Sequence, residues 1–182
     1  MAARTTRPGP SLSCGHTAAG RGSCVVSMVP PFGDEQVTLR DWRDEDVGNL
    51  AMWLRPGHRW QDLDAPYFPQ PSDAERDAVI DKMRERVHQV ELPTPRRGLV
   101  VAATADQRFL GEVGWYWESE ATDWRRMGIA LYDPGSWNRG IGTGAMQLWT
   151  NYLFASTQVR RLDFATWSGN APGVAPRPAA SA

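Results

Sequence analysis

Three glycines at alternate positions, Gly140, Gly142 and Gly144, stand between an apolar segment and an amphipathic segment of the chain. The stretch around them, residues 133–149, reads DPGSWNRGIGTGAMQLW. A glycine-rich turn that opens a helix can bind phosphate, because its backbone N–H groups converge and the helix dipole favours negative charge. The junction is therefore a candidate site for a ligand that carries phosphate.

Three interpretations fit the junction by itself. The glycines could simply permit a tight turn into a helix. A dinucleotide site is a second interpretation, since Asp163 lies near the position of a ribose-binding acid, but the glycine spacing is GxGxG rather than GxGxxG. In the third, the backbone N–H groups of residues 139–143 cradle the pyrophosphate of coenzyme A, with Arg139 adding a charge and Thr143 a hydroxyl.

Hydrophobic periodicity places this junction in an α/β domain. Alternation of apolar and polar residues predicts strands, and apolar residues at one-face spacing predict helices. Strands are expected at residues 37–42, 98–105, 109–117, 127–132 and 161–167, and helices at 43–54, from 72 to 90, and after the glycines with an apolar face from 145 to 153. This order predicts an α/β sheet with both pairing directions.

Two stretches carry a resemblance to the GNAT superfamily of N-acetyltransferases, and within it to the RimJ/RimL-like branch: GIALYDPGSWNRGIGTGAMQLWTNYLF and RRLDFATWSGN. The acyl-CoA motif of that superfamily is Q/R-x-x-G-x-G/A. Gly140 and Gly142 match its glycines, and Trp137 takes its first position. The likeness covers residues 37–170 and implies a GNAT-like fold, with a mixed, mostly antiparallel sheet flanked by helices.

The resemblance implies that acetyl-CoA is the co-substrate. In this fold two strands splay apart, and the pantetheine arm enters the gap as a substitute strand. The edge near Ile129 would line one side of the gap, and the strand at 161–167 the other. The expected cofactor-binding residues are Ile129, Leu131, Trp137, Arg139, Gly140, Ile141, Gly142, Thr143, Gly144 and Asn170.

Acetyl transfer to an amine requires a base for the amine, polarisation of the thioester carbonyl and protonation of the leaving thiolate. Members of the superfamily commonly use an acid on the central strands as the base, and Glu112 is the candidate in this sequence. Strict alternation predicts that Glu112 shares one strand face with Leu110, Gly114 and Tyr116. Arg126 stands where the histone-acetylating branch carries its catalytic glutamate, so that mechanism is not expected.

The acceptor amine is selected in this superfamily largely by the first two helices and their connecting loop. Trp60, Tyr67 and Phe68 lie in that loop, and aromatic faces suit a cationic amine. The alternative is that these rings fill the base of the sheet. We expect the acceptor to be a primary amine of a small molecule or of a protein N-terminus.

The composition excludes several other classes. The net charge of −1 argues against a nucleic-acid partner, and no run of about 18 apolar residues predicts a membrane span. Cys14 and Cys24, the only cysteines, suit a reducing cytoplasm, and with His16 they lack the fourth ligand of a zinc site. A cytoplasmic protein without a metal is therefore expected.

Both ends of the chain lack a hydrophobic pattern. We expect residues 1–36 to be a disordered extension, 37–170 the GNAT-like domain and 171–182 a disordered tail. The superfamily continues with a helix and two strands, so the sequence predicts a C-terminally truncated domain whose exposed sheet edge could form a homodimer. The predicted function is acetyl-CoA-dependent N-acetyl transfer; the alternative is a non-catalytic remnant that binds CoA or has no activity.

Overall fold

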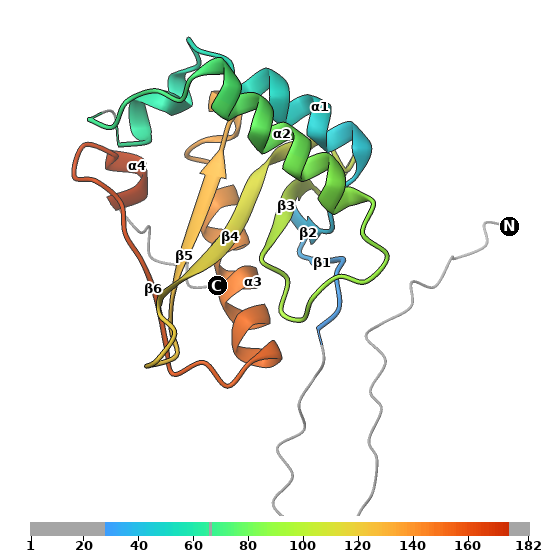
Figure 1. The fold of residues 1–182 in the computed structure, drawn as a ribbon. Helices are drawn as coiled ribbons and strands as arrows, with labels where there is room; N and C mark the ends of the chain where they lie inside the picture. The colour runs from blue at the N-terminus through green and yellow to red at the C-terminus, as the bar shows by residue number, and fades with distance from the viewer. Residues whose placement is uncertain (1–27, 66, 175–182) are drawn as a thin grey trace, which may run out of the picture.

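The computed structural model describes residues 28–65 and 67–174, and a six-stranded sheet forms its centre (Figure 1). The strands lie in chain order across the sheet, antiparallel except for the last pair, β5 and β6. Their bounds are β1 Phe32–Gly33, β2 Val37–Arg40, β3 Gly98–Ala103, β4 Phe109–Ser119, β5 Trp124–Leu131 and β6 Arg161–Phe164. The predicted mixed, mostly antiparallel α/β fold is confirmed.

Helices cover both faces of this sheet (Figure 1). Their bounds are α1 Asp44–Trp53, α2 Asp73–Val87, α3 Ile141–Ser156 and α4 Ala171–Val174, with 3-10 turns η1 Arg59–Leu63 and η2 Pro134–Ser136. The parallel pairing of β5 with β6 requires a crossover, and α3 provides it. Within the described ranges, no helix is long and apolar enough to cross a membrane.

Two elements lie in ranges where the sequence predicts disorder. Strand β1 falls within residues 1–36: it pairs with β2, and the ring of Phe32 stacks on Tyr152 at 5.3 Å between centroids, which accounts for its order. Helix α4 falls within residues 171–182. The predicted disorder of residues 1–27 and 175–182, and both cysteines, lie outside the described residues.

The core has two halves, one on each side of the sheet. On the first side, α3 packs against the central strands through Ala145, Trp149 and Leu153. On the second side, α1 and α2 cover Val100 and Phe109 with Leu50, Ile80 and neighbouring aromatic rings. The second half also contains Tyr132, which follows the last residue of β5.

A bulge in β4 changes which side chains share a face. Gly111 pairs with Val101 and Phe109 pairs with Ala102, so Leu110 is an extra residue of β4. Leu110 consequently packs in the α3 half of the core, whereas Phe109 packs in the α1/α2 half. The expectation that Leu110 shares a face with Glu112 is therefore wrong, because the extra residue breaks the alternation.

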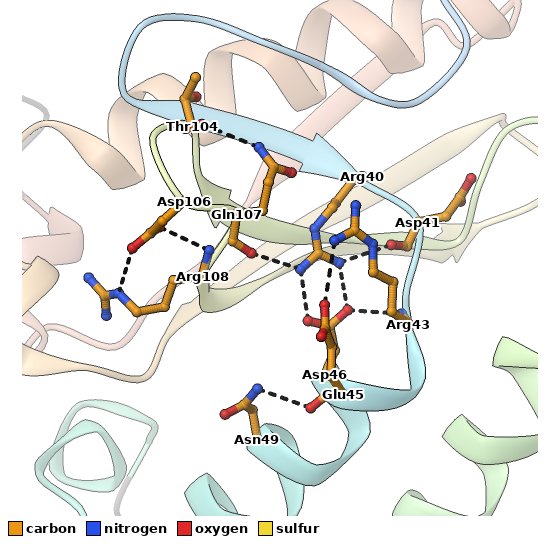
Figure 2. A network of polar contacts seen from close by, with 10 residues as sticks. All are labelled: Arg40, Asp41, Arg43, Glu45, Asp46, Asn49, Thr104, Asp106, Gln107 and Arg108. Atoms are coloured by element: carbon orange, nitrogen blue, oxygen red, sulfur yellow. Dashed lines mark hydrogen bonds and ion pairs between the residues drawn. The ribbon is translucent and has the colours of Figure 1, made fainter.

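A buried ion pair joins β2 to the first turn of α1 (Figure 2). The guanidinium of Arg40 donates from Nη1 to Oδ2 of Asp46 at 2.6 Å and from Nη2 to Oδ1 at 2.8 Å. Oδ2 also accepts from the Arg43 backbone N–H at 2.8 Å, and Nη2 donates to the Gln107 carbonyl at 3.1 Å. The two side chains are only 3% and 1% exposed. The network fixes α1, and with it one wall of the α1/α2 half of the core.

Replacement of Asp46 by alanine should therefore be strongly destabilising, because it leaves the Arg40 charge buried without a partner. We expect a loss of about 3–5 kcal/mol in the free energy of unfolding, measured by urea titration. The exposed pair between Asp81 and Arg84 is the matched control, and Asp81→Ala should cost less than about 1 kcal/mol. Equal losses for the two variants would contradict this assignment.

Candidate active site

The sheet is split between β5 and β6. These strands pair over four residue pairs, from Trp124 with Arg161 to Met127 with Phe164. β6 ends there, whereas β5 runs on to Leu131. In the described part of the chain, residues 128–131 thus pair with β4 alone, and their other side is an open edge.

Ile129 presents its backbone to that open edge. The Tyr132 N–H donates to the Leu110 carbonyl of β4 at 3.1 Å. Alternate residues of a strand direct their backbone groups to the same side, so those of Ile129 and Leu131 point away from β4. Trp137 Nε1 donates to the Leu131 carbonyl at 2.9 Å and closes the end of the edge. Ile129, whose residue surface is 37% exposed, remains available to a bound chain.

The amino end of α3 lies at the mouth of this split. Gly140 is its N-cap with a φ of +84°, a left-handed conformation that favours glycine. The first hydrogen bond of the helix runs from the Gly144 N–H to the Gly140 carbonyl, so the N–H groups of the preceding turn have no acceptor within the helix. A β-carbon on Gly142 would lie 3.4 Å from Leu131 Cδ1, which shows how closely this turn adjoins the end of β5.

The other predicted cofactor residues differ in their surroundings. Ile141 is partly buried in the first turn of α3, and Thr143 is exposed there. Arg139 is exposed, and its Nη1 reaches the Gly135 carbonyl at 3.5 Å. Asn170 instead bonds locally, because its Nδ2 donates to Thr166 Oγ1 at 3.0 Å and its Oδ1 accepts from the Gly173 N–H at 3.1 Å.

Glu112 lies one strand away from the split, on the face covered by α1 and α2. It pairs with Ala130, a residue of the open edge. The Tyr132 hydroxyl donates to its Oε1 at 2.6 Å. Burial raises the pKa of Glu112, and the hydrogen bond from Tyr132 and the charge of Arg86 act in the opposite direction. Glu112 is thus a carboxylate with a raised pKa beside the gap, as a general base requires.

The three predicted substrate-binding aromatics do not form one cluster. Trp60 packs edge-on against Tyr132 at 5.0 Å between centroids, and its Nε1 donates to the Trp53 carbonyl at 2.8 Å. Tyr67 and Phe68, each 67% exposed, contact one another at 4.9 Å. Tyr67 also meets Trp167 at 6.3 Å. Trp60 therefore packs on the tyrosine that contacts Glu112, whereas Tyr67 and Phe68 lie together on the surface, with Tyr67 against Trp167.

Arg126 and Asp163 hold the closed end of the split. Arg126 Nε donates to Asp163 Oδ1 at 3.0 Å, and its Nη1 lies 2.9 Å from Glu118 Oε2. Trp124 Nε1 donates to the other oxygen of Asp163 at 2.9 Å. The hydrogen bond from Arg126 lowers the pKa of Asp163. Asp163 is thus engaged in joining β5 to β6, which does not favour the dinucleotide interpretation.

Tyr132 was not predicted from the sequence. Its contact with Glu112 depends on the β4 bulge, which displaces Leu110 from the face that Tyr132 occupies. The only local signal is Gly111, where a β-carbon would overlap the carbonyl oxygen of Ala130. A glycine that permits such close approach is typical of a bulge but does not show which residue is displaced.

Comparison with known proteins gives the family. Residues 36–175 match the model of the acetyltransferase (GNAT) domain, whereas no curated protein sequence gives a significant match.

Solved structures with the same fold include three bacterial acetyltransferases. A GNAT-family acetyltransferase from Bacillus anthracis is 12% identical with a TM-score of 0.58, over 78% of this chain and 76% of that one. An acetyltransferase from Agrobacterium tumefaciens is 14% identical with a TM-score of 0.58, over 80% and 79%. The ribosomal-protein-S5-alanine acetyltransferase from Vibrio fischeri is 17% identical with a TM-score of 0.59, over 79% and 77%.

The family match covers residues 36–175, most of the chain. These residues include the split between β5 and β6 and the glycine N-cap of α3. The chain therefore belongs to the GNAT acetyltransferase domain family.

Proposed function

We propose that the protein is an acetyl-CoA-dependent N-acetyltransferase that acetylates a primary amine of a small molecule or of a protein N-terminus. One observation carries the proposal: the open edge of β5, residues 128–131, lies beside the amino end of α3, where Gly142 adjoins Leu131. An extended pantetheine arm needs an unpaired strand edge, and a pyrophosphate needs converging N–H groups. The open strand edge and the adjoining helix N-terminus therefore support a coenzyme A site here.

In this proposal the pyrophosphate lies on the turn from Arg139 to Gly144, where Gly140 keeps the left-handed backbone. The interaction of each phosphate charge with the helix dipole contributes roughly 0.3–1 kcal/mol. The pantetheine arm pairs with Ile129, and Trp137 ends that pairing because its indole occupies the Leu131 carbonyl. Asn170 has the weakest support among the predicted cofactor residues, since its side chain caps α4.

Glu112 acts as the general base. It takes a proton from the ammonium form of the substrate, and the neutral nitrogen then forms a bond to the acetyl carbonyl carbon. The carbon–sulfur bond breaks, its electron pair stays on sulfur, and the thiolate receives the second proton that the nitrogen gives up. Because β5 lies between Glu112 and the open edge, the backbone of Glu112 and the bound arm would be two strand spacings, about 10 Å, apart, and the proton would pass to Glu112 through a water molecule.

We assign the chain to the RimJ/RimL-like branch because Trp137 takes the first position of the motif. The Vibrio fischeri protein is named for an alanine of a ribosomal protein, so protein N-termini belong in the panel of acceptor amines. The proposed cytoplasmic location rests on the composition of the chain.

The proposed homodimer forms through β6. This strand lies at the edge of the sheet, and its residue Phe164 is 57% exposed. Sedimentation velocity tests whether the protein is a dimer.

Calorimetric titration with acetyl-CoA tests the binding site. Gly142→Trp should weaken binding at least about tenfold, because the indole would fill the mouth of the split. Gly48→Trp on α1 is the matched control, since a β-carbon there contacts nothing within 4 Å. Absence of binding by the wild-type protein, or equal weakening by both variants, would contradict the site.

The pH dependence of kcat/KM tests the base. Glu112 must be ionised to accept a proton, and burial raises its pKa, so activity should fall as the pH is lowered through a value above that of an ordinary glutamate. Glu112→Gln should remove this limb and lower kcat by roughly 10²- to 10⁴-fold. Glu120→Gln is the control, since Glu120 is exposed and directly follows β4. This variant should keep both the acidic limb and the wild-type kcat. An intact limb in Glu112→Gln would assign the base elsewhere.

A further inference from the structure

Tyr132 stands out among the buried polar side chains because its hydroxyl contacts the proposed base directly. Its residue surface is 2% exposed, and its hydroxyl lies 2.6 Å from Glu112 Oε1. Nothing in the glycine motif or in the aromatic loop requires a tyrosine at this position. The position follows β5 immediately, where the chain turns toward η2.

The backbone at Tyr132 is fixed by the β4 bulge. Its N–H donates to the carbonyl of Leu110, the extra residue of β4. Ala130 and Tyr132 are two residues apart, so both side chains project to the face of Glu112. In a regular strand a residue at position 110 would also project there. The bulge turns Leu110 to the α3 side, and the Tyr132 ring occupies the face that Leu110 leaves.

The ring of Tyr132 is held by three other aromatic rings. Phe109 stacks on it at 5.8 Å between centroids with an interplanar angle of 12°, and Trp53 at 6.3 Å with 15°. Trp60 meets it edge-on at 5.0 Å. Such contacts each contribute about 0.5–1.5 kcal/mol beyond burial. The Tyr132 ring is therefore packed on several sides, with its hydroxyl on Glu112.

We propose that Tyr132 is a positioning residue for acetyl transfer, whose hydroxyl holds Oε1 of Glu112 and leaves Oε2 to receive the proton of the acceptor amine. This inference rests on the proposed function. Oε1 is occupied by a donor that does not give up its proton, because burial and the neighbouring Glu112 raise the pKa of Tyr132 well above that of an ordinary tyrosine. The amine proton moves to Oε2, the new N–C bond forms as the C–S bond breaks, and the second amine proton goes to the thiolate.

Two charged groups face Glu112 and Tyr132: Arg86 lowers the pKa of Glu112, and Asp64 raises the pKa of Tyr132. Arg86, on α2, faces Glu112 and donates from Nη2 to the Gly98 carbonyl at 2.8 Å. Asp64, at the end of η1, faces Tyr132. A phenol that donates to a carboxylate stabilises the charged form. Loss of the hydroxyl therefore raises the pKa of Glu112 further, and the acidic limb of activity moves to higher pH.

Tyr132→Phe tests the inference, because it keeps the stacked ring and removes only the hydroxyl. We expect kcat/KM to fall roughly tenfold near neutral pH, the acidic limb to move upward and acetyl-CoA affinity to stay unchanged. Tyr116→Phe, on the same face of β4 and 53% exposed, should change none of these. In the Glu112→Gln background Tyr132→Phe should cause no further loss, since its effect passes through Glu112.

Titration of the Glu112 carboxyl by carbon NMR separates this inference from the proposed function, since it needs neither acetyl-CoA nor turnover. A higher Glu112 pKa in Tyr132→Phe than in the wild type supports the inference. An equal pKa, or independent losses in the double variant, would overturn it. A wild-type protein without acetyltransferase activity would contradict the proposed function, while the NMR comparison would still decide whether the Tyr132 hydroxyl holds the Glu112 carboxylate.

Discussion

The β5 strand pairs with β4 along its length but with β6 over only four residue pairs, and the site depends on this inequality. At the closed end, Arg126 and Asp163 tie the two strands together. Beyond Met127 the backbone of β5 keeps its outward N–H and C=O groups with no strand to satisfy them in the described part of the chain. An unpaired edge presents a row of N–H and C=O groups with which another extended chain can pair. In the proposed function, this open edge binds the extended ligand and sets its location.

The β4 bulge places Tyr132 beside Glu112, the proposed base. One extra residue, Leu110, reverses the alternation of side chains and leaves a place beside Glu112 that the Tyr132 ring fills. The carboxylate is buried, and one of its oxygens accepts a hydrogen bond from Tyr132. The buried ion pair between Arg40 and Asp46 supports this arrangement from a distance, because it fixes α1, which carries Trp53 over Tyr132.

The sequence was sufficient for the parts of the fold that depend on local pattern. Apolar periodicity located five of the six strands and the three longer helices, and the capping box of Ser72 and Glu75 marked the start of α2. The glycine junction was predicted because a left-handed N-cap restricts residue type, as Gly140 does. Each of these signals depends only on residues that are close together in the sequence.

Features that depend on register or tertiary contact were not predicted. The bulge at Leu110 adds one residue to a strand, which periodicity alone does not reveal, and the role of Tyr132 follows from it. The order of β1 depends on the stacking of Phe32 on Tyr152, which lies more than a hundred residues away in the chain. The separation of Trp60 from Tyr67 and Phe68 likewise depends on which partner each ring finds.

Hydrogen exchange at single amides, followed by NMR with and without coenzyme A, tests the open edge most directly. We expect exchange at the Ile129 N–H to slow by about tenfold or more when coenzyme A binds, because this N–H gains a partner. The Ala130 N–H, which points to β4, should change little, and 3′,5′-ADP, which lacks the pantetheine arm, should leave Ile129 unprotected. No protection at Ile129 with saturating coenzyme A would contradict the pairing of the pantetheine arm with the open edge of β5.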